Sequence, residues 1–278
     1  MTWASGDESM TQSVVDVAVA RGVARVTLRR PRLGNALDAA MRRELRTALE
    51  NVAARDSVRA VVICADGRLF CTGADLQEAA ERLRSAVDPG ILRRDVEAQM
   101  ASEYRPIFAA IATMQKPVLA ALQGSAAGAG AALALCCDLK VMAEDAQLLL
   151  PFAQVGLVTD CGSSWLLVRQ LGYSRAYQLA AEGKGMSAAK ALQWGLINRV
   201  GARADVQADA MAWAENIAAG ASAAFAATKQ AMRYALSHDL LDTFDFESAL
   251  QARLAASADH REGVEAFLEK RPPDFGHR

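Results

Sequence analysis

The fold is constrained most strongly by short apolar runs that alternate with segments of helical spacing. Runs at residues 22–28, 58–64, 117–122 and 139–143 have the length and composition of β-strands. Apolar positions recur at helical spacing over 36–52, where Asn35 can cap the helix, and again over 129–135. Strand and helix units therefore repeat at similar spacing, which predicts an α/β fold.

A longer region separates the second strand from the third. The Gly-Ala-Asp sequence at 73–75 is expected to open a helix, and a second helix is predicted from about 91 to 114. Between them, residues 77–94 mix charges and contain Asp-Pro-Gly at 88–90, which indicates a break or a mobile segment. Loops of this kind often border functional sites.

The last part of the chain changes character, because strand signals stop at Val200. Helices are predicted over 205–219, 221–236, 240–256 and 261–270, with a boundary near 201–204. An all-helical tail with apolar stripes is too small for much core of its own. We therefore expect this tail to pack on the first domain or on a neighbouring subunit.

Composition excludes several classes of protein. Lys and Arg total 31 against 32 Asp and Glu, so the whole chain is attracted neither to nucleic acid nor to anionic membranes. A local patch must meet any anionic ligand. The first 13 residues lack a basic and apolar leader, so we expect a disordered N-terminus and a cytoplasmic protein. The cysteines show no metal-ligand spacing and are interpreted as reduced thiols: Cys64, Cys71, Cys136, Cys137 and Cys161.

One uncharged stretch, residues 117–137, is about long enough to span a bilayer. Gln123, Gly124 and Ser125 interrupt it, and it is rich in weakly apolar alanine and glycine. A buried strand followed by a tightly packed helix explains the stretch better than a membrane span does.

Two glycine-rich turns, at 70–75 and 123–130, each follow a predicted strand and precede a helix. Helix N-termini carry unpaired N–H groups and a partial positive charge, so two of them converging would form an oxyanion site from main chain alone. Either turn alone is more typical of a tight connection with close helix packing. The glycine spacing matches neither a dinucleotide-binding fingerprint nor a phosphate-binding loop.

Together with other motifs, these turns resemble the crotonase superfamily of enoyl-CoA hydratases and isomerases from about residue 14 to 275. The supporting motifs are Arg30-Pro31, Asn35-Ala36, Gly156-Leu157-Val158, Gly195-Leu196-Ile197-Asn198 and Phe267-Leu268-Glu269-Lys270-Arg271. The resemblance implies a spiral of repeated strand–strand–helix units over 14–200 and a helical segment over 201–278 that forms trimers or hexamers. It also implies an acyl-CoA thioester as substrate, with no metal and no cofactor.

By motif position, the resemblance assigns the two oxyanion-binding N–H groups to Ala74 and Ala129. Candidate substrate contacts, by the same resemblance, are Arg32, Leu33, Ala36, Thr72, Gly73, Asp75, Leu76, Gly128, Val155 and Lys270. Lys270 matches a position that meets the nucleotide end of CoA. Arg32 and Lys270 are equally consistent with solvated surface charges, and Asp75 is better suited to capping its helix than to reacting.

The reaction is indicated by three positions. Hydratases of the family use two glutamates, and the motifs place Ala132 and Phe152 there, neither of which can carry a proton. Asp160 lies in Leu-Val-Thr-Asp-Cys-Gly-Ser-Ser-Trp, which resembles a segment of ring-epoxide phenylacetyl-CoA isomerases. A related isomerase shifts a double bond from the 3 to the 2 position with one carboxylate as base. We expect Asp160 to do this with a pKa raised by its apolar surroundings, although it could also cap the helix that follows.

Other hypotheses stay open at this point. An unusual hydratase could recruit Glu78, Glu81 or Asp88, and a CoA-binding protein would need no catalysis. Covalent dehalogenation by an aspartate would need a histidine, and His238, His260 and His277 all lie in the tail. Cys161 is interpreted as a packing residue. The helix over 36–52 offers Arg42, Arg43 and Arg46 to RNA but also Asp38, Glu44 and Glu50, so binding of nucleic acid is not expected.

Overall fold

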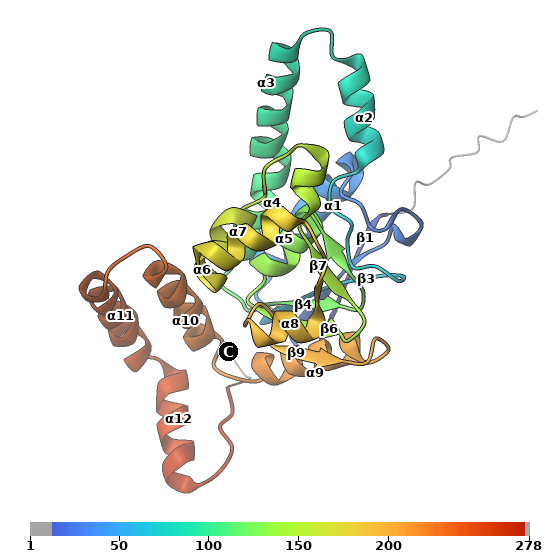
Figure 1. Ribbon diagram of the computed structural model, residues 1–278. Coiled ribbons are helices and arrows are strands. Elements are labelled where there is room, and N and C mark those ends of the chain that lie inside the picture. The colour runs from blue at the N-terminus through green and yellow to red at the C-terminus, as the bar shows by residue number, and fades with distance from the viewer. Residues whose placement is uncertain (1–12, 276–278) are drawn as a thin grey trace, which may run out of the picture.

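The computed structural model describes residues 13–275 and confirms the predicted α/β fold (Figure 1). The predicted disordered segment, 1–13, lies outside the described residues except for Ser13. The main sheet contains β1 (Val15–Ala20), β2 (Val23–Leu28), β3 (Ala60–Ala65), β4 (Val118–Leu122), β6 (Leu139–Ala143) and β9 (Arg199–Gly201), in that spatial order. The first pair is antiparallel and every later pair is parallel.

The central strands are buried along their whole length, because helices cover both faces of the sheet. Every residue of β3 and β4 is buried, which explains why their sequences are continuous apolar runs without alternation. Helix α1 (Ala39–Ala54) packs on β1 and β2, and α9 (Val206–Ala218) packs on β2, β3, β4 and β6. The predicted boundary at 201–204 therefore falls just before α9, a helix that packs on the main sheet.

A smaller sheet extends the core toward α6 (Ser163–Leu171), α7 (Tyr173–Glu182) and α8 (Ala188–Gln193). It contains β5 (Ala126–Ala127), β7 (Gln147–Leu149) and β8 (Met186–Ser187). Helix α5 (Ala129–Cys136), all of whose residues are buried, packs against β5, α4 and α6. Complete burial of α5 and β4 explains the uncharged stretch at 117–137, and among the described residues no helix has the length and hydropathy needed to cross a membrane.

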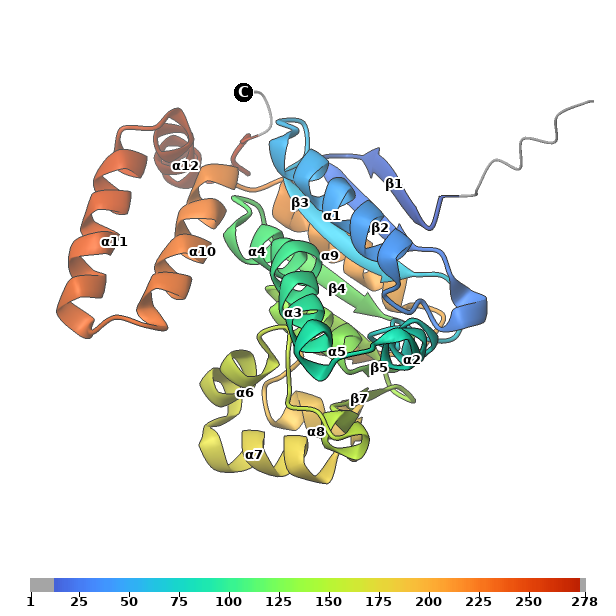
Figure 2. The same ribbon diagram turned by 90° about the horizontal axis from the view of Figure 1, so that it is seen from above.

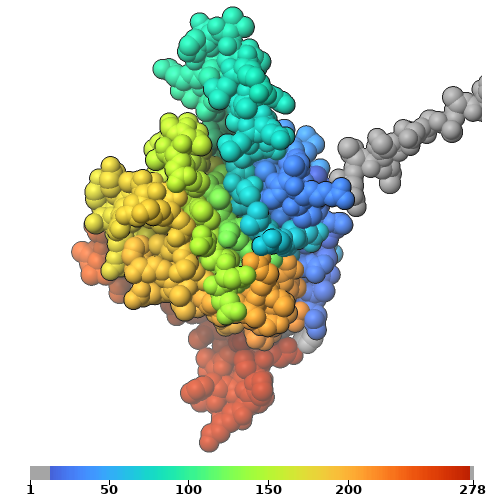
Figure 3. Space-filling view, turned by 45° about the vertical axis from the view of Figure 1, so that its right-hand side comes forward, coloured from blue at the N-terminus to red at the C-terminus, as the bar shows by residue number. Residues whose placement is uncertain are grey.

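Residues 77–94 form helices, so the predicted break is confined to the turn that joins them. Helix α2 (Leu76–Ser85) and α3 (Pro89–Gln99) make a hairpin that projects from the core (Figures 1 and 3). A π-helical turn (Met100–Tyr104) connects α3 to α4 (Arg105–Thr113). Asp88 caps α3 by accepting hydrogen bonds from the N–H groups of Gly90 and Ile91, at 2.6 and 3.2 Å.

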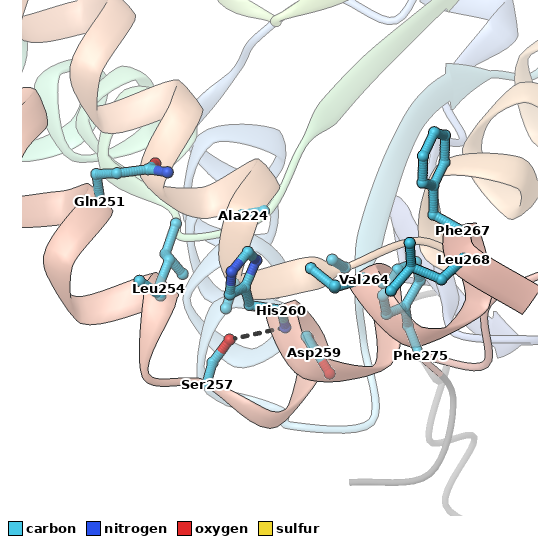
Figure 4. Close-up of a pocket in the computed structure, with 14 residues that line it drawn as sticks. Ala224, Gln251, Leu254, Ser257, Asp259, His260, Val264, Phe267, Leu268 and Phe275 are labelled. Atoms are coloured by element: carbon cyan, nitrogen blue, oxygen red, sulfur yellow. Dashed lines mark hydrogen bonds between the residues drawn. The ribbon is translucent and has the colours of Figure 1, made fainter.

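The helices that stand away from the sheet are α10 (Ser222–Ala235), α11 (Leu240–Ala255) and α12 (Ala258–Glu269) (Figure 2). They enclose a cavity of about 530 Å³ with the end of the described chain (Figure 4). Leu254, Val264, Phe267 and Phe275 line that cavity, and Phe267 on α12 is nevertheless 83% exposed.

Candidate functional site

Three chain segments lie side by side at the centre of the site. The N–H of Thr72 donates to the carbonyl of Gly34 (3.0 Å), and the N–H of Leu37 donates to the carbonyl of Gly73 (2.7 Å). On the other side, the N–H of Ala127 donates to the carbonyl of Cys71 (2.9 Å). The two glycine-rich turns are therefore neighbours, held together by main-chain hydrogen bonds.

Gly73 shows how closely the two turns approach. A Cβ atom at this position would lie 2.7 Å from the carbonyl oxygen of Ala127 and 3.0 Å from the nitrogen of Ala129. The φ angle of Gly73 is also +90°, a backbone conformation that residues other than glycine rarely adopt. Glycine is thus required here by both conformation and contact.

The main-chain N–H groups of Ala74 and Ala129 are both unpaired in the described part of the chain. Ala129 is the first residue of α5, and the preceding Gly128 provides no side-chain cap. Ala74 directly precedes Asp75, whose carboxylate caps α2 by accepting from the N–H groups of Gln77 and Glu78, at 2.9 and 3.3 Å. Two free N–H groups on adjacent turns, each beside a helix N-terminus, suit a developing oxyanion.

Asn35 does not cap α1, contrary to the sequence prediction. The helix begins at Ala39, and its cap is Asp38, which accepts from the N–H of Met41 (2.8 Å). Asn35 has a left-handed backbone (φ 54°) and is fully buried. Its side chain accepts from the N–H of Arg30 (2.8 Å) and donates to the carbonyls of Asp66 and Leu69 (2.9 and 3.0 Å), so it fastens the 34–37 segment to the loop before Thr72.

Asp160 lies in the loop before α6, and its carboxylate does not cap that helix. The N-cap position is Gly162, and it is the main-chain carbonyl of Asp160 that accepts from the N–H and hydroxyl of Ser163, at 2.8 and 2.7 Å. The oxygen Oδ1 of Asp160 is buried without a hydrogen-bond partner. Burial raises the pKa of Asp160 above its usual range, and the adjacent Cys161 thiol offsets part of this effect.

Residues of the Asp160 loop interact electrostatically with the first glycine-rich turn and with the π-helical turn. The thiol of Cys161 lies near enough to Cys71 for that residue to affect the pKa of Cys161, which burial raises most. Tyr104, on the π-helical turn, has its pKa raised by burial, and Asp160 adds to the increase. Cys161 is therefore within electrostatic range of Cys71, and Asp160 is within electrostatic range of Tyr104.

The two positions assigned to hydratase glutamates carry no acid. Ala132 is fully buried inside α5, and Phe152 is buried in a short 3₁₀ helix (Pro151–Val155). The ring atom Cζ of Phe152 would lie 3.8 Å from a Cβ at Gly128, so the ring borders the glycine-rich turn at 123–130. Phe152 also lines a cavity of about 480 Å³, together with Thr159 and the helices α6 and α7.

The remaining candidate contacts divide into those near the turns and one that is remote. Arg32 and Leu33 are exposed on a 3₁₀ turn (Pro31–Leu33) beside a surface cavity of about 510 Å³. Ala36 is buried next to the bridge between Leu37 and Ala74. The other candidates near these turns are Thr72 and Leu76, both exposed, and Val155, 56% exposed at the end of the Phe152 turn.

Lys270 ends α12, at the opposite end of the molecule from the α2–α3 hairpin (Figure 1). A single chain does not bring it to Ala74 or Ala129. The tail histidines are equally remote: His260 begins α12 beside the cavity of Figure 4 and His238 stacks on Tyr234, whereas His277 lies outside the described residues. No group of three or more His, Cys, Asp or Glu residues in the 13–275 range is arranged to hold a metal ion.

Sequence reasoning missed the roles of Arg42, Glu78 and Tyr104 around the site. Arg42 was considered only as part of a mixed surface patch, yet its side chain is 2% exposed and forms ion pairs with Glu78 and Glu103, at 2.8 and 2.6 Å. One signal was present: Tyr104, Ile107 and Ile111 form an apolar stripe at helical spacing, which predicts burial of the tyrosine. Nothing in the sequence pairs that tyrosine with Arg42.

Comparison with known proteins shows the family of this chain. Residues 18–278 match the family model described as enoyl-CoA hydratase/isomerase. A Rhodobacter capsulatus protein named "Probable enoyl-CoA hydratase" is 42% identical over 97% of this chain and 100% of its own length. The 1,2-epoxyphenylacetyl-CoA isomerase of Escherichia coli is 36% identical over 92% of this chain and 96% of its own.

Solved structures share the fold as well. The crystal structure of an enoyl-CoA hydratase from Polaromonas superposes with a TM-score of 0.87 and 32% identity, covering 94% of this chain and 98% of that one. The repeated strand and helix units, the paired glycine turns and these matches agree. The chain belongs to the enoyl-CoA hydratase/isomerase family of the crotonase superfamily.

Proposed function

We propose that this protein is an acyl-CoA isomerase with Asp160 as its single base. The observation that carries the proposal is the buried, unpartnered carboxylate oxygen Oδ1 of Asp160, in a loop whose Cys161 is within electrostatic range of Cys71, on the turn that bears Ala74. A carboxylate with a buried oxygen that accepts no hydrogen bond is costly, and such groups are typical of reaction centres. Ala132 and Phe152 at the hydratase positions leave this carboxylate as the acid–base group.

The proposed reaction moves one double bond and one proton. Asp160 removes a proton from C2 of a 3-enoyl thioester, and the electrons form a dienolate whose oxygen accepts from the N–H groups of Ala74 and Ala129. The protonated carboxyl then returns the proton to C4, which leaves a 2-enoyl thioester. An acyl group carrying an epoxidised aromatic ring is a second substrate class. No cofactor or metal is needed, because CoA is part of the substrate.

Hydration is the alternative, and the names of relatives favour it: the 42%-identical protein is named a hydratase, and Escherichia coli 2,3-dehydroadipyl-CoA hydratase is 34% identical. The acids considered for it are poorly available. Glu78 is bound by Arg42 and Arg82, each at 2.8 Å, and Asp88 caps α3. Glu81 would have to supply the chemistry alone.

We further propose a trimer or hexamer in which Lys270 serves the site of a neighbouring subunit. Within one chain Lys270 is remote from the turns, and the α10–α12 helices expose several large apolar side chains, including Leu240, Phe244 and Phe267. The proposed compartment is the cytoplasm, where thiols stay reduced, since all five cysteines are free and buried. We propose no membrane or nucleic-acid partner.

The test is turnover of 3-enoyl-CoA, 2-enoyl-CoA and ring-epoxide phenylacetyl-CoA, followed by absorbance and mass spectrometry. We expect isomerisation without change of mass, and Asp160→Asn should lower turnover about a hundredfold to ten-thousandfold. The matched control is Asp145→Asn, an exposed aspartate paired with Arg203, which should keep full activity. Gain of one water on 2-enoyl-CoA, or a fully active Asp160→Asn variant, would contradict the proposal. Binding of CoA thioesters without any turnover would contradict the proposal and would support a non-catalytic acyl-CoA-binding protein.

A further inference from the structure

The side chain of Arg42, in the first turn of α1, is buried with a full set of partners. Its Nη1 and Nη2 donate to the two carboxylate oxygens of Glu78 (3.1 and 2.8 Å), and its Nε donates to Glu103 (2.6 Å). Nη1 also donates to the carbonyl of Leu37 (2.5 Å). The guanidinium lies over the ring of Tyr104, 5.1 Å from the centroid. One side chain thus joins four elements.

The α2–α3 hairpin has little else to hold it. Neither helix contains a buried residue, although both belong to the described part of the chain. Leu83 and Val87, near its tip, are largely exposed. Polar contacts replace a core: Glu78 accepts from Arg82 (2.8 Å) and from Gln99 of α3 (3.1 Å), besides its two bonds from Arg42. Glu78 therefore ties both hairpin helices to α1 through Arg42.

The other contacts of Arg42 lead into the site. Leu37, whose carbonyl it binds, is paired with Ala74 in an isolated β-bridge, and the N–H of Leu37 holds the carbonyl of Gly73. Tyr104 donates to the same carbonyl of Leu37 (3.4 Å) and stands near Asp160. Glu103 and Tyr104 both lie on the π-helical turn, a distortion that is frequent at functional sites.

We propose that Arg42 is a positioning residue. It acts as a clamp that holds the α2–α3 hairpin in a fixed position relative to the glycine-rich turn at 70–75 and the π-helical turn. With the clamp formed, α2 is held against α1 and borders the thioester bound at Ala74. Without it, α2 is released from α1, while α3 stays continuous with the π-helical turn and α4. This inference takes from the proposed function only the place of the thioester. It concerns residues that do not touch the reacting atoms.

The test compares Arg42→Met and Glu78→Gln with a matched control, Arg46→Met. Arg46 lies one turn further along α1 and pairs with Glu50 at 2.7 Å, but on the exposed surface. Hydrogen exchange of residues 76–99 in the free protein reports the hairpin. We expect at least about tenfold faster exchange there in both clamp variants, with the β3 and β4 amides unchanged and Arg46→Met like wild type.

Kinetics provide a second readout that loss of stability alone would not produce. Glu78→Gln should raise KM about tenfold and leave kcat within about threefold, because it frees the hairpin and spares the Leu37 contact. Arg42→Met should raise KM similarly and also lower kcat, because it releases Leu37 beside Ala74. Unchanged exchange over 76–99 in Glu78→Gln, which folds with Arg42 still held by Glu103, would overturn the clamp.

Failure of the clamp and failure of the isomerase proposal are distinguishable. Exchange in the free protein and calorimetric affinity for acetyl-CoA require no turnover. If Asp160→Asn stays active while exchange in the hairpin rises and acetyl-CoA affinity falls in Glu78→Gln, the clamp stands and the assigned base is wrong. If the hairpin is unaffected while Asp160→Asn is inactive, the clamp is wrong and the base stands.

Discussion

Arg42 is a buried charged residue and Asp160 a partly buried one, and their surroundings differ. Arg42 is surrounded by acceptors, and although burial lowers its pKa, the carboxylates of Glu78 and Glu103 outweigh this and raise the pKa overall. Asp160 has an oxygen without a partner, and burial raises its pKa. The partners of Arg42 therefore keep its guanidinium charged, whereas the surroundings of Asp160 favour uptake of a proton by its carboxylate.

This difference teaches how to assign roles to buried charges. A paired, hydrogen-bonded charge stabilises the structure around it, because removing one partner leaves the other charge buried without compensation. A carboxylate with an unpartnered buried oxygen lowers the stability of the folded protein, and groups of this kind are typical of catalytic sites. Gln123 also buries an unpartnered oxygen in the described region, but its amide does not ionise and its nitrogen donates to two carbonyls.

The largest effect that would sharpen this comparison is the dependence of turnover on pH. Asp160 must be ionised to accept a proton, so kcat should fall about tenfold per pH unit below its pKa in the bound complex. Because burial raises that pKa, the fall should begin above the range of an ordinary aspartate, near 3.9. Steady-state kinetics across the range in which the protein stays folded would measure it. A flat profile down to about pH 4 would remove Asp160 as the base.

The next effect concerns the stability conferred by the paired charge. Replacing Arg42 by Met removes several charge-assisted hydrogen bonds and should lower the free energy of unfolding by about 2–3 kcal/mol. Denaturant unfolding of wild type, Arg42→Met and Arg46→Met would measure it, with the Arg46 change expected below about 0.5 kcal/mol because that pair is exposed. Equal losses in the two variants would mean that burial of Arg42 has no energetic consequence.

The smallest effect is a gain in stability at the unpaired charge. The folded protein holds the proton of Asp160 more tightly than the unfolded chain does, so ionisation costs stability fully above the raised pKa. Asp160→Asn removes this cost and should unfold at a higher temperature at neutral pH. The advantage should shrink as pH falls through the raised pKa and vanish below the ordinary one. Thermal unfolding that shows the variant less stable at pH 7 would contradict the assignment.

Much of this architecture follows from local sequence. Continuous apolar runs predicted β3 and β4 because strands covered on both faces need no polar side, and the glycine turns were located by their place between strand and helix. Asn35 was misassigned as a cap because asparagine accepts main-chain hydrogen bonds in many settings. Its actual partners, the carbonyls of Asp66 and Leu69, lie more than thirty positions away in sequence.

The sequence by itself determined the α/β repeat, because hydrophobic period is a local property. Its motifs also resemble those of a known family, and that resemblance supplied the family and the candidate positions Ala74, Ala129 and Asp160. Only the tertiary structure decided that the two glycine turns touch, that Asp160 does not cap α6, and that Arg42 is buried between Glu78 and Glu103. The reason is physical: burial and hydrogen-bond partners depend on which distant segments meet, and the cost or benefit of a charge depends on those partners.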